Sequence, residues 1–287
     1  MSEVRAAEIP AVATRRTRRV SPAIALCVLV MAVMTVVALL GDAVAPTDPS
    51  SQDVFAGLTK PSAAHWLGTD ELGRDVFSRL IAGTRAALLG PAVIALGSFL
   101  VGNVLGLIAG YYGGTSDSIV MRWVDLMLAI PALLVVIVVS GATGGGYWVA
   151  VGLLLALTIP FDTRVVRGAT LEQTPLPYVE AAKTLGISSR RIMLLHIWPN
   201  VSATAVANTF LVFTVSLISL SGLSYLGLGS SPGSADWGLM LAEGQQYLFL
   251  NPVATLVPAL LIIIAAVAMN LLGDWLQERL STRGATR

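Results

Sequence analysis

The segment Gly229-Ser-Ser-Pro-Gly233 matches the letters of the G-x-S-x-G nucleophile elbow, in which a serine hydroxyl attacks an acyl group. That chemistry needs an oxyanion hole, and one of its donors is the backbone N–H of the residue after the serine. Here that residue is Pro232, which has no N–H. The H-E-x-x-H spacing of zinc metalloproteases does not occur in the sequence either. We therefore expect neither serine hydrolase nor metalloprotease chemistry.

The lysines and the cysteine also lack the neighbours that cofactor chemistry needs. A Walker A loop places a glycine directly before its lysine, so that backbone N–H groups can hold phosphates. Lys60 follows Thr59 and Lys183 follows Ala182, so neither lysine fits a nucleotide site. Cys27 is the single cysteine, which excludes an intrachain disulfide and Cys-based zinc or redox motifs. We expect the chain to catalyse no reaction and to bind no cofactor or metal.

The composition predicts that these residues are positioned by membrane-spanning helices. Of 287 residues, 55% are hydrophobic and 12% are charged, and the mean hydropathy is +0.77, which is more apolar than a soluble core can bury. The net charge of +1 does not indicate nucleic-acid binding. A helix crosses the hydrocarbon with about 20 residues. Six apolar runs approach this length: Ala23 to Leu40, Ala86 to Ala109, Ile119 to Ser140, Tyr147 to Phe161, Val201 to Leu220 and Pro252 to Leu272.

Lysine and arginine are unevenly distributed between the connections of these runs. Cytoplasmic segments of membrane proteins hold the excess of positive charge. With six spans, one side carries fourteen of the 18 positive residues and the other side carries four. We therefore expect both chain ends in the cytoplasm. The fourteen are Arg5, Arg15, Arg16, Arg18, Arg19, Arg122, Arg164, Arg167, Lys183, Arg190, Arg191, Arg279, Arg283 and Arg287, and the four are Lys60, Arg74, Arg79 and Arg85.

The N-terminal segment also fits a second interpretation. A basic region, an apolar stretch and Ala43-Val-Ala45 together resemble a cleavable signal peptide. The apolar stretch is longer than the roughly 7–15 residues of such a peptide, and Pro46 follows directly. We therefore expect a membrane helix, and cleavage would not change the orientation of the later spans. The predicted parts are a cytoplasmic arm (1–22), a first transmembrane helix (23–40), an extracytoplasmic segment (41–84), a transmembrane core (85–272) with a cytoplasmic loop (164–200), and a cytoplasmic tail (273–287).

The cytoplasmic loop contains signals for two short helices. The first is predicted to end at Gly186, where glycine allows a left-handed conformation. Glu180, Ala181 and Ala182 lie inside it, and small side chains let a helix press closely against a partner. On these residues alone, an ordinary structured loop explains the pattern equally well. The other signals are Thr174 as a cap, Pro175 or Pro177 at the helix start, Ser188 or Ser189 as the cap of a second helix from Arg190 to Trp198, and Pro199 before the fifth span.

The spacing of this loop resembles the EAA loop of ABC importer permeases. Glu180-Ala-Ala is followed after three residues by Gly186, then by nine residues and the block His196-Ile-Trp-Pro199. Trp198 departs from the His-Ile-Leu-Pro-Asn block that is common in the oligopeptide, dipeptide and nickel branch, whereas Asn200 matches it. The resemblance implies that the loop docks a coupling helix into an ATPase subunit. The residues implied in coupling are Glu180, Ala181, Ala182, Lys183, Leu185, Gly186 and Pro199.

Further motifs extend the resemblance over nearly the whole chain and favour the C-type branch of the dipeptide, oligopeptide and nickel permeases. They occur in the family's order. They are His65 to Arg79 with the core Leu67-Gly-Thr-Asp-Glu-Leu-Gly-Arg-Asp75, then Asp117, Met121-Arg122, Asp125 and Pro131, then Tyr225-Leu-Gly-Leu-Gly229 with Trp237-Gly238, and Asn270-Leu-Leu-Gly273-Asp274.

This resemblance implies an all-α membrane protein of about six helices with the type I ABC importer permease fold. It also implies a heterodimer with a homologous permease, in the bacterial cytoplasmic (inner) membrane. The implied partners are two cytoplasmic ATP-binding subunits, which hold ATP and magnesium, and an extracytoplasmic substrate-binding protein. Segments 41–84 and 225–250 would face that binding protein or seal the outer gate.

Two further patterns concern helix packing. Gly102, Gly106, Gly110 and Gly114 repeat every four residues, which predicts a close helix-packing seam or a gate. Arg122 and Asp125 are three residues apart and are predicted to pair on one helix face. Asp162 and Asp274 are further ionisable residues that we expect near cytoplasmic helix ends. Four spans contain prolines that can bend them: Pro91, Pro131, Pro160 and Pro258.

The function expected from these observations is import of dipeptides or oligopeptides, as one half of an ATP-driven translocation pathway. Nickel or another small solute is the alternative within the same architecture, because these motifs do not separate the cargoes. A stand-alone secondary transporter would show repeated halves or a polar cluster at the membrane midplane, and the sequence shows neither. A membrane enzyme would need a catalytic constellation that two histidines and one cysteine do not supply.

Overall fold

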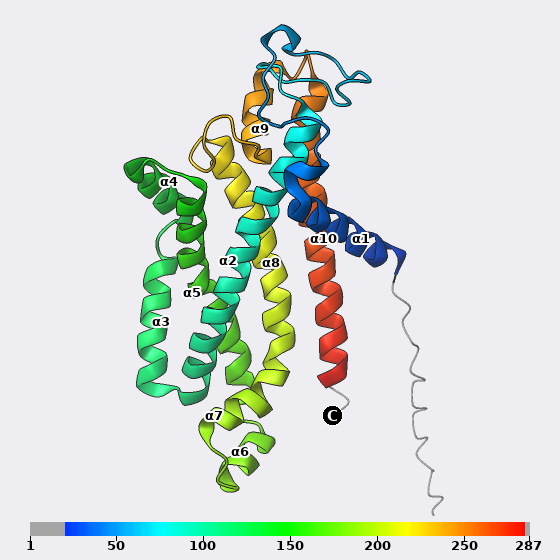
Figure 1. The fold of residues 1–287 in the computed structure, drawn as a ribbon. Helices are drawn as coiled ribbons and strands as arrows, with labels where there is room; N and C mark the ends of the chain where they lie inside the picture. The colour runs from blue at the N-terminus through cyan, green and yellow to red at the C-terminus, as the bar shows by residue number, and fades with distance from the viewer. Residues whose placement is uncertain (1–20, 285–287) are drawn as a thin grey trace, which may run out of the picture.

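The computed structural model describes residues 21–284, and this part of the chain is built from α-helices joined by loops and short helical turns (Figure 1). The all-α prediction is therefore confirmed. Arg5, Arg15, Arg16, Arg18, Arg19 and Arg287, which contribute to the predicted orientation, lie outside the described residues. The helices are α1 (Pro22–Leu40), α2 (Val76–Tyr112), α3 (Gly114–Leu128), α4 (Ala132–Thr143), α5 (Tyr147–Gln173), α6 (Pro177–Thr184), α7 (Ser189–Ile192), α8 (Trp198–Tyr225), α9 (Trp237–Gly244) and α10 (Pro252–Gly284).

Five helical segments of the described chain are long and apolar enough to cross a membrane: α1, α2, α5, α10 and the run Ser189–Tyr225 that includes α8. They coincide with five of the six predicted spans. The third predicted span is wrong as one continuous helix, because α3 and α4 meet at an angle of 71°. Pro131 lies at this break with an extended backbone. The residue before a proline is disfavoured in helical conformation, which explains why α3 ends here.

Helix boundaries follow from local capping. The Ser21 hydroxyl accepts a hydrogen bond from the Ile24 N–H at 3.3 Å, and Pro22 opens α1. The Asp75 carboxylate accepts one from the Ser78 N–H at 2.8 Å and caps α2. Because of this cap, α2 begins ten residues before the apolar run at Ala86. Residues 76–84 of the predicted outer segment are therefore helical.

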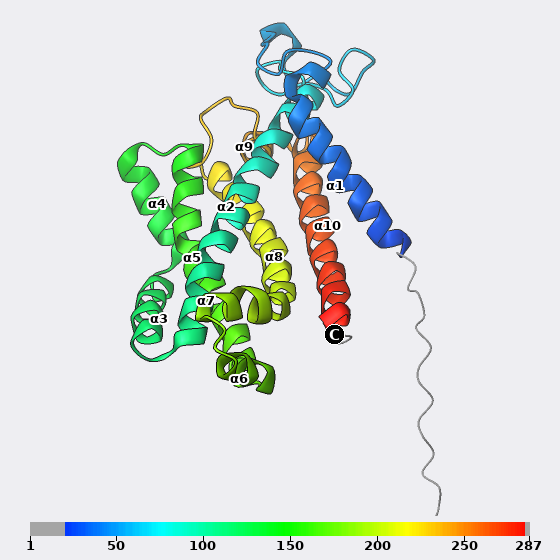
Figure 2. The ribbon, with the colours of Figure 1, turned by 60° about the horizontal axis from the view of Figure 1, so that its bottom comes forward.

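Helices α2, α5 and α8 pack together in the middle of the bundle, α10 lies along α8, and α1 contacts α2 and α10 from outside (Figures 1 and 2). Ile94 of α2, Ala150 of α5, Leu217 of α8 and Ala265 of α10 are buried in one apolar cluster. Leu, Ile and Val side chains remain exposed on the outer faces of these helices, as expected for helices surrounded by lipid.

The segments 41–75 and 226–251 fold together at one end of the bundle, and we call them the outer crown (Figure 1). A buried network of charges joins its two segments. Arg74 and Arg79 are each only 1% exposed. Asp70 Oδ2 accepts hydrogen bonds from Arg74 Nε and Arg79 Nη1, both at 2.6 Å. Glu243 Oε2, from α9, accepts from Arg74 Nη2 at 3.0 Å and from Arg79 Nη1 at 2.8 Å.

Two backbone carbonyls also take part in this network. Arg74 Nη1 donates to the Gly233 carbonyl at 3.1 Å, and Arg79 Nη2 donates to the Ser234 carbonyl at 3.0 Å. Buried charges are tolerated when they are paired and hydrogen-bonded in this way. The start of α2 is therefore held to the loop before α9 and to α9 itself.

Removing Glu243 leaves two buried arginines with one carboxylate between them. We expect Glu243→Ala to destabilise the protein by about 2 kcal/mol, which lowers the melting temperature by roughly 5 °C. Thermal unfolding in detergent measures this shift. Glu172→Ala, at an exposed glutamate of α5, is the control and should leave the midpoint unchanged. Equal midpoints for the two variants would show that the network does not hold the crown.

Candidate functional site

The loop between α5 and α8 projects from the end of the bundle opposite the outer crown (Figures 1 and 2). It contains α6, α7 and a π-helical turn over Met193–Ile197. The C-terminal end of α10 lies at the same end of the molecule (Figure 2). The predicted loop 164–200 begins inside α5, which continues to Gln173.

The ends of α6 agree in part with the predicted signals. Pro177 is its first residue, and Gly186 follows its end with φ +76°, as predicted. Thr174 is not the cap, because it lies at the end of α5 and its hydroxyl donates to the Thr170 carbonyl at 2.8 Å. Leu176 takes the cap position with an extended backbone. Helix α6 therefore has eight residues, about two turns.

The second predicted helix, from Arg190 to Trp198, is interrupted. Helix α7 starts at Ser189, the π-helical turn Met193–Ile197 follows, and α8 begins at Trp198. Pro199 lies in the first turn of α8, where a missing N–H is tolerated. The Trp198 ring packs edge-on against Phe99 of α2 with 6.0 Å between ring centroids. This residue, which departs from the family block, thus contacts a neighbouring span.

Helix α6 has one face inside the protein and one face outside it. Val179 is fully buried and Ala182 is 4% exposed. Glu180, Ala181 and Lys183 are exposed, and Leu185, just beyond the helix, is 79% exposed. Ala182 was predicted on the docking face together with Ala181. The structure corrects this, because Ala182 packs against the chain's own core.

The buried face of α6 belongs to an apolar cluster that we call the loop core. It contains residues from the loop and from three spans. This shared apolar packing links the position of α6 to the ends of these spans that lie opposite the outer crown, because packed cores resist deformation. The members are Leu107 of α2, Val166 of α5, Val179 and Ala182 of α6, Ile192 of α7, Ile197, and Val201 and Ala205 of α8.

Lys183 and Tyr178 further attach α6 to the bundle. The Lys183 ammonium lies 5.4 Å from the centroid of the Tyr111 ring at the end of α2, a cation–π contact. The Tyr178 hydroxyl donates to Gln173 Oε1 at 2.9 Å and accepts from Asn200 Nδ2 at 3.2 Å. These bonds connect α6 with the end of α5 and the start of α8.

The predicted glycine seam runs along the loop core, and the core residues Leu107 and Val166 lie between the two ends of the seam. A Cβ atom on Gly102 would be 2.6 Å from Asp162 Cβ, and one on Gly110 would be 2.7 Å from Thr170 Cβ. On Gly106 it would be 2.8 Å from the Thr163 carbonyl oxygen and 2.9 Å from the Arg167 nitrogen. These three glycines let α2 and α5 approach closely, which supports the packing interpretation.

Gly114 does not belong to the seam. It starts α3 with φ +56°, and a Cβ atom there would meet nothing within 4 Å. The seam therefore ends at Gly110, because α2 itself ends at Tyr112.

Two ion pairs connect α3 with α5. Arg164 pairs with Asp125, and Arg167 pairs with Asp117, with 2.6 Å between Nη2 and Oδ2. The predicted pair of Arg122 with Asp125 is therefore wrong, because the guanidinium that reaches Asp125 comes from α5. The two arginines were identified in the sequence only as positive charges of the loop.

Asp162 is deeply buried between helices. It is 3% exposed, and its Oδ1 accepts a hydrogen bond from Asn208 of α8. Within residues 21–284, its Oδ2 accepts no hydrogen bond. Asn208 lines a small surface pocket between α5, α8 and α10, which Asn270 and Asp274 also line. Asp162 therefore joins α5 to α8 above the loop core.

The two histidines lie at opposite ends of the molecule. His65 Nδ1 is 3.0 Å from Asp75 Oδ1 in the crown, whereas His196 lies in the π-helical turn of the loop. The Ser230 hydroxyl, in the segment that imitates a nucleophile elbow, donates to Asp236 Oδ2 at 2.8 Å.

The family described as binding-protein-dependent transport system inner membrane component matches residues 102–284, which include the glycine seam, the loop and its core. The chain belongs to this family. The permease is 39% identical over 223 residues to the glutathione transport system permease protein GsiD of Pectobacterium atrosepticum, covering 78% of the chain and 74% of the relative. It is 33% identical over 263 residues to the probable D,D-dipeptide transport system permease protein DdpC of Escherichia coli, covering 92% of the permease and 88% of the relative.

A third relative is the dipeptide transport system permease protein DppC of Haemophilus influenzae, 34% identical over 257 residues with 88% of the permease and 87% of the relative covered. Among solved structures, a chain of the MetNI methionine ABC transporter in an inward-facing conformation matches with a TM-score of 0.57 and 18% identity. The match covers 70% of the permease and 96% of that chain. The fold is therefore that of a type I ABC importer permease, as predicted.

The seam gives a test of how closely α2 and α5 must approach in this permease. We expect Gly106→Ala to destabilise it by about 2 kcal/mol, because the added methyl meets backbone atoms that cannot rotate away. Gly168→Ala, where a Cβ meets nothing within 4 Å, is the matched control. It should leave stability unchanged or raise it, since alanine favours helix. Thermal unfolding of both purified variants measures the difference, and equal midpoints would contradict the account.

Proposed function

We propose that this permease is one transmembrane subunit of an ATP-driven, binding-protein-dependent importer of dipeptides or oligopeptides. Family membership supports import together with a binding protein. The names of the relatives, which refer to glutathione, D,D-dipeptides and dipeptides, support short peptides as the cargo. The permease itself would carry out no chemistry. ATP and magnesium would be held by two cytoplasmic ATPase subunits.

The observation that carries the proposal is the two-sided packing of α6. Val179 and Ala182 anchor it to the loop core, while Glu180, Ala181 and Leu185 face outward at the tip of the molecule. An exposed leucine beside a charged face is suited to a protein partner with an apolar groove. A movement of such a partner would be transmitted through the loop core to α2, α5 and α8.

The membrane orientation follows from the same assignment. The permease would lie in the bacterial inner membrane with both termini in the cytoplasm, in agreement with the distribution of lysine and arginine. The outer crown would then face the binding protein. A homologous permease would supply the other half of the translocation pathway.

ATP-dependent uptake of labelled di- to hexapeptides into proteoliposomes tests the proposal. The complex contains the permease, its homologous partner, both ATPase subunits and the binding protein. We expect Glu180→Arg to reduce uptake at least about tenfold while the subunits remain in the membrane, because a reversed charge at the interface with the ATPase costs several kcal/mol. Glu172→Arg, the same reversal on the exposed surface of α5, should retain uptake.

The outcomes separate the parts of the proposal. Uptake by the wild-type permease without ATPase subunits would contradict an ATP-driven importer. ATP hydrolysis by the full assembly without peptide uptake would contradict the peptide cargo and make nickel the next solute to test. Equal loss in both charge-reversal variants would contradict the role of α6.

A further inference from the structure

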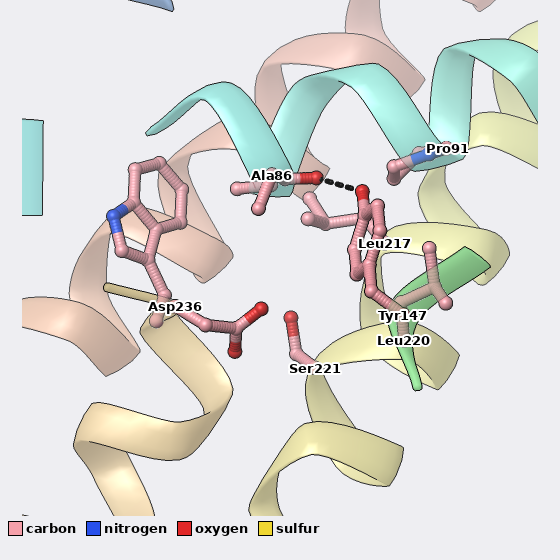
Figure 3. Close-up of a pocket in the computed structure, with 9 residues that line it drawn as sticks. Ala86, Pro91, Tyr147, Leu217, Leu220, Ser221 and Asp236 are labelled. Atoms are coloured by element: carbon pink, nitrogen blue, oxygen red, sulfur yellow. Dashed lines mark hydrogen bonds between the residues drawn. The ribbon is translucent and has the colours of Figure 1, made fainter. Parts of the chain in front are cut away.

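A tyrosine hydroxyl is inserted into the hydrogen-bond ladder of α2 (Figure 3). The Tyr147 hydroxyl donates to the Ala86 carbonyl and accepts from the Gly90 N–H at 2.9 Å. Ala86 and Gly90 are four residues apart, so a regular α-helix would bond them directly to each other. The hydroxyl of Tyr147, the first residue of α5, thus lies between the N–H donor and the carbonyl acceptor of one backbone hydrogen bond of α2.

The next rung of α2 has no donor. Pro91 follows Gly90 inside the helix, and proline has no N–H to offer the Ala87 carbonyl. Sharp bends in helices occur at prolines and where a side chain enters the ladder, and here both causes act on adjacent residues. This position therefore divides α2 into an outer half, Val76–Gly90, and an inner half that continues to Tyr112.

The surroundings are shaped to hold the hydroxyl in this position. A Cβ atom on Gly90 would be 2.2 Å from the Tyr147 oxygen, so only glycine leaves room for it. Three glycines with positive φ, at 144–146, set the start of α5 and the position of Tyr147. A small cavity next to the ring is lined by Leu217, Leu220 and Ser221 of α8 and by Asp236 and Trp237 before and in α9 (Figure 3).

The outer half of α2 is attached to the outer crown by two buried contacts. Arg79 is part of the buried charge network with Glu243. The Trp237 indole donates to the Leu80 carbonyl at 3.0 Å. The inner half of α2 packs instead against α5 along the glycine seam. The Tyr147 bridge thus lies between a part of α2 that is fixed to the crown and a part that is fixed to α5 along the glycine seam.

We propose that Tyr147 is a positioning residue of the transport cycle, whose hydroxyl holds open the rung between Ala86 and Gly90 and so sets the angle between the two halves of α2. The crown end and the loop end of the permease can then change their relative position at this point. Only the role of this bend in an ATP-driven cycle rests on the proposed function. The effect of the Tyr147 hydroxyl on the angle of α2 is a property of the permease alone.

Tyr147→Phe removes only the hydroxyl, after which the Gly90 N–H can bond the Ala86 carbonyl directly. Spin labels at Lys60→Cys in the crown and Ser116→Cys in α3, in a Cys27→Ser background, report the angle through a distance distribution. The complete transporter is measured without nucleotide and trapped with ATP and vanadate. Tyr225→Phe, which removes an exposed hydroxyl that donates to Gln245 at 2.5 Å, is the matched control.

We expect the wild type and Tyr225→Phe to shift their distance distribution between the two states. Tyr147→Phe should show a shifted distance distribution in the nucleotide-free state and a smaller change on trapping. Its peptide uptake should be lower by about five- to tenfold, the effect expected when one hydrogen bond that stabilises a conformation is lost. Pro91→Ala restores the other missing donor with the hydroxyl intact. It should shift the distribution in the same direction even if Tyr147→Phe assembles poorly.

Distance distributions of Tyr147→Phe and Pro91→Ala that coincide with those of Tyr225→Phe in both states would overturn the inference. A wild-type distribution that does not change on trapping would also overturn it. If the wild-type assembly imports no peptide, the proposed function fails, but the nucleotide-free distances still decide whether the hydroxyl sets the angle of α2.

Discussion

The close approach of α2 and α5 is the constraint on which the rest of the structure depends. Gly102, Gly106 and Gly110 place the backbone of α2 directly against Asp162, Val166 and Thr170 of α5. Lipid provides no hydrophobic driving force for the association of membrane helices, so close packing of this kind holds helix pairs together. The seam brings Leu107 and Val166 together, and this pair is the part of the loop core against which α6 and the start of α8 pack.

Helix α2 connects the loop core to the opposite end of the molecule. Its first turns carry Arg79, which is held by Asp70 and Glu243 in the outer crown. One long helix therefore links the two ends at which the family's partners would bind, and the Tyr147 bridge interrupts its ladder between them. An importer needs such a connection, because energy is supplied on one side and substrate arrives on the other.

Much of this arrangement could be predicted from the sequence. Five spans follow from the length of the apolar runs, and the end of α6 just before Gly186 follows from the conformational freedom of glycine. Both signals act locally. Contacts between distant residues could not be predicted in this way. The pairing of Asp125 with Arg164, 39 residues away, depends on how α3 packs on α5, whereas the sequence favoured the local partner Arg122. The same holds for Glu243, which lies 164 residues from Arg79.

Which alanine of α6 faces the protein could not be predicted from residue type, because Ala181 and Ala182 are neighbours with the same side chain. Packing decides that Ala182 turns inward while Ala181 stays outside. The Tyr147 bridge was not anticipated either. Pro91 marks a bend, but the residue that completes it comes from another helix.

Cysteine cross-linking between α6 and the ATPase subunit tests the central claim most directly. Single cysteines at Glu180, Lys183 and Leu185 would be compared with cysteines at the buried positions Val179 and Ala182, in membranes that contain the full complex. The account predicts cross-links to the ATPase from the exposed positions only. Cross-links from none of the exposed positions, or labelling of these positions by a membrane-impermeant reagent from the outer side, would contradict it.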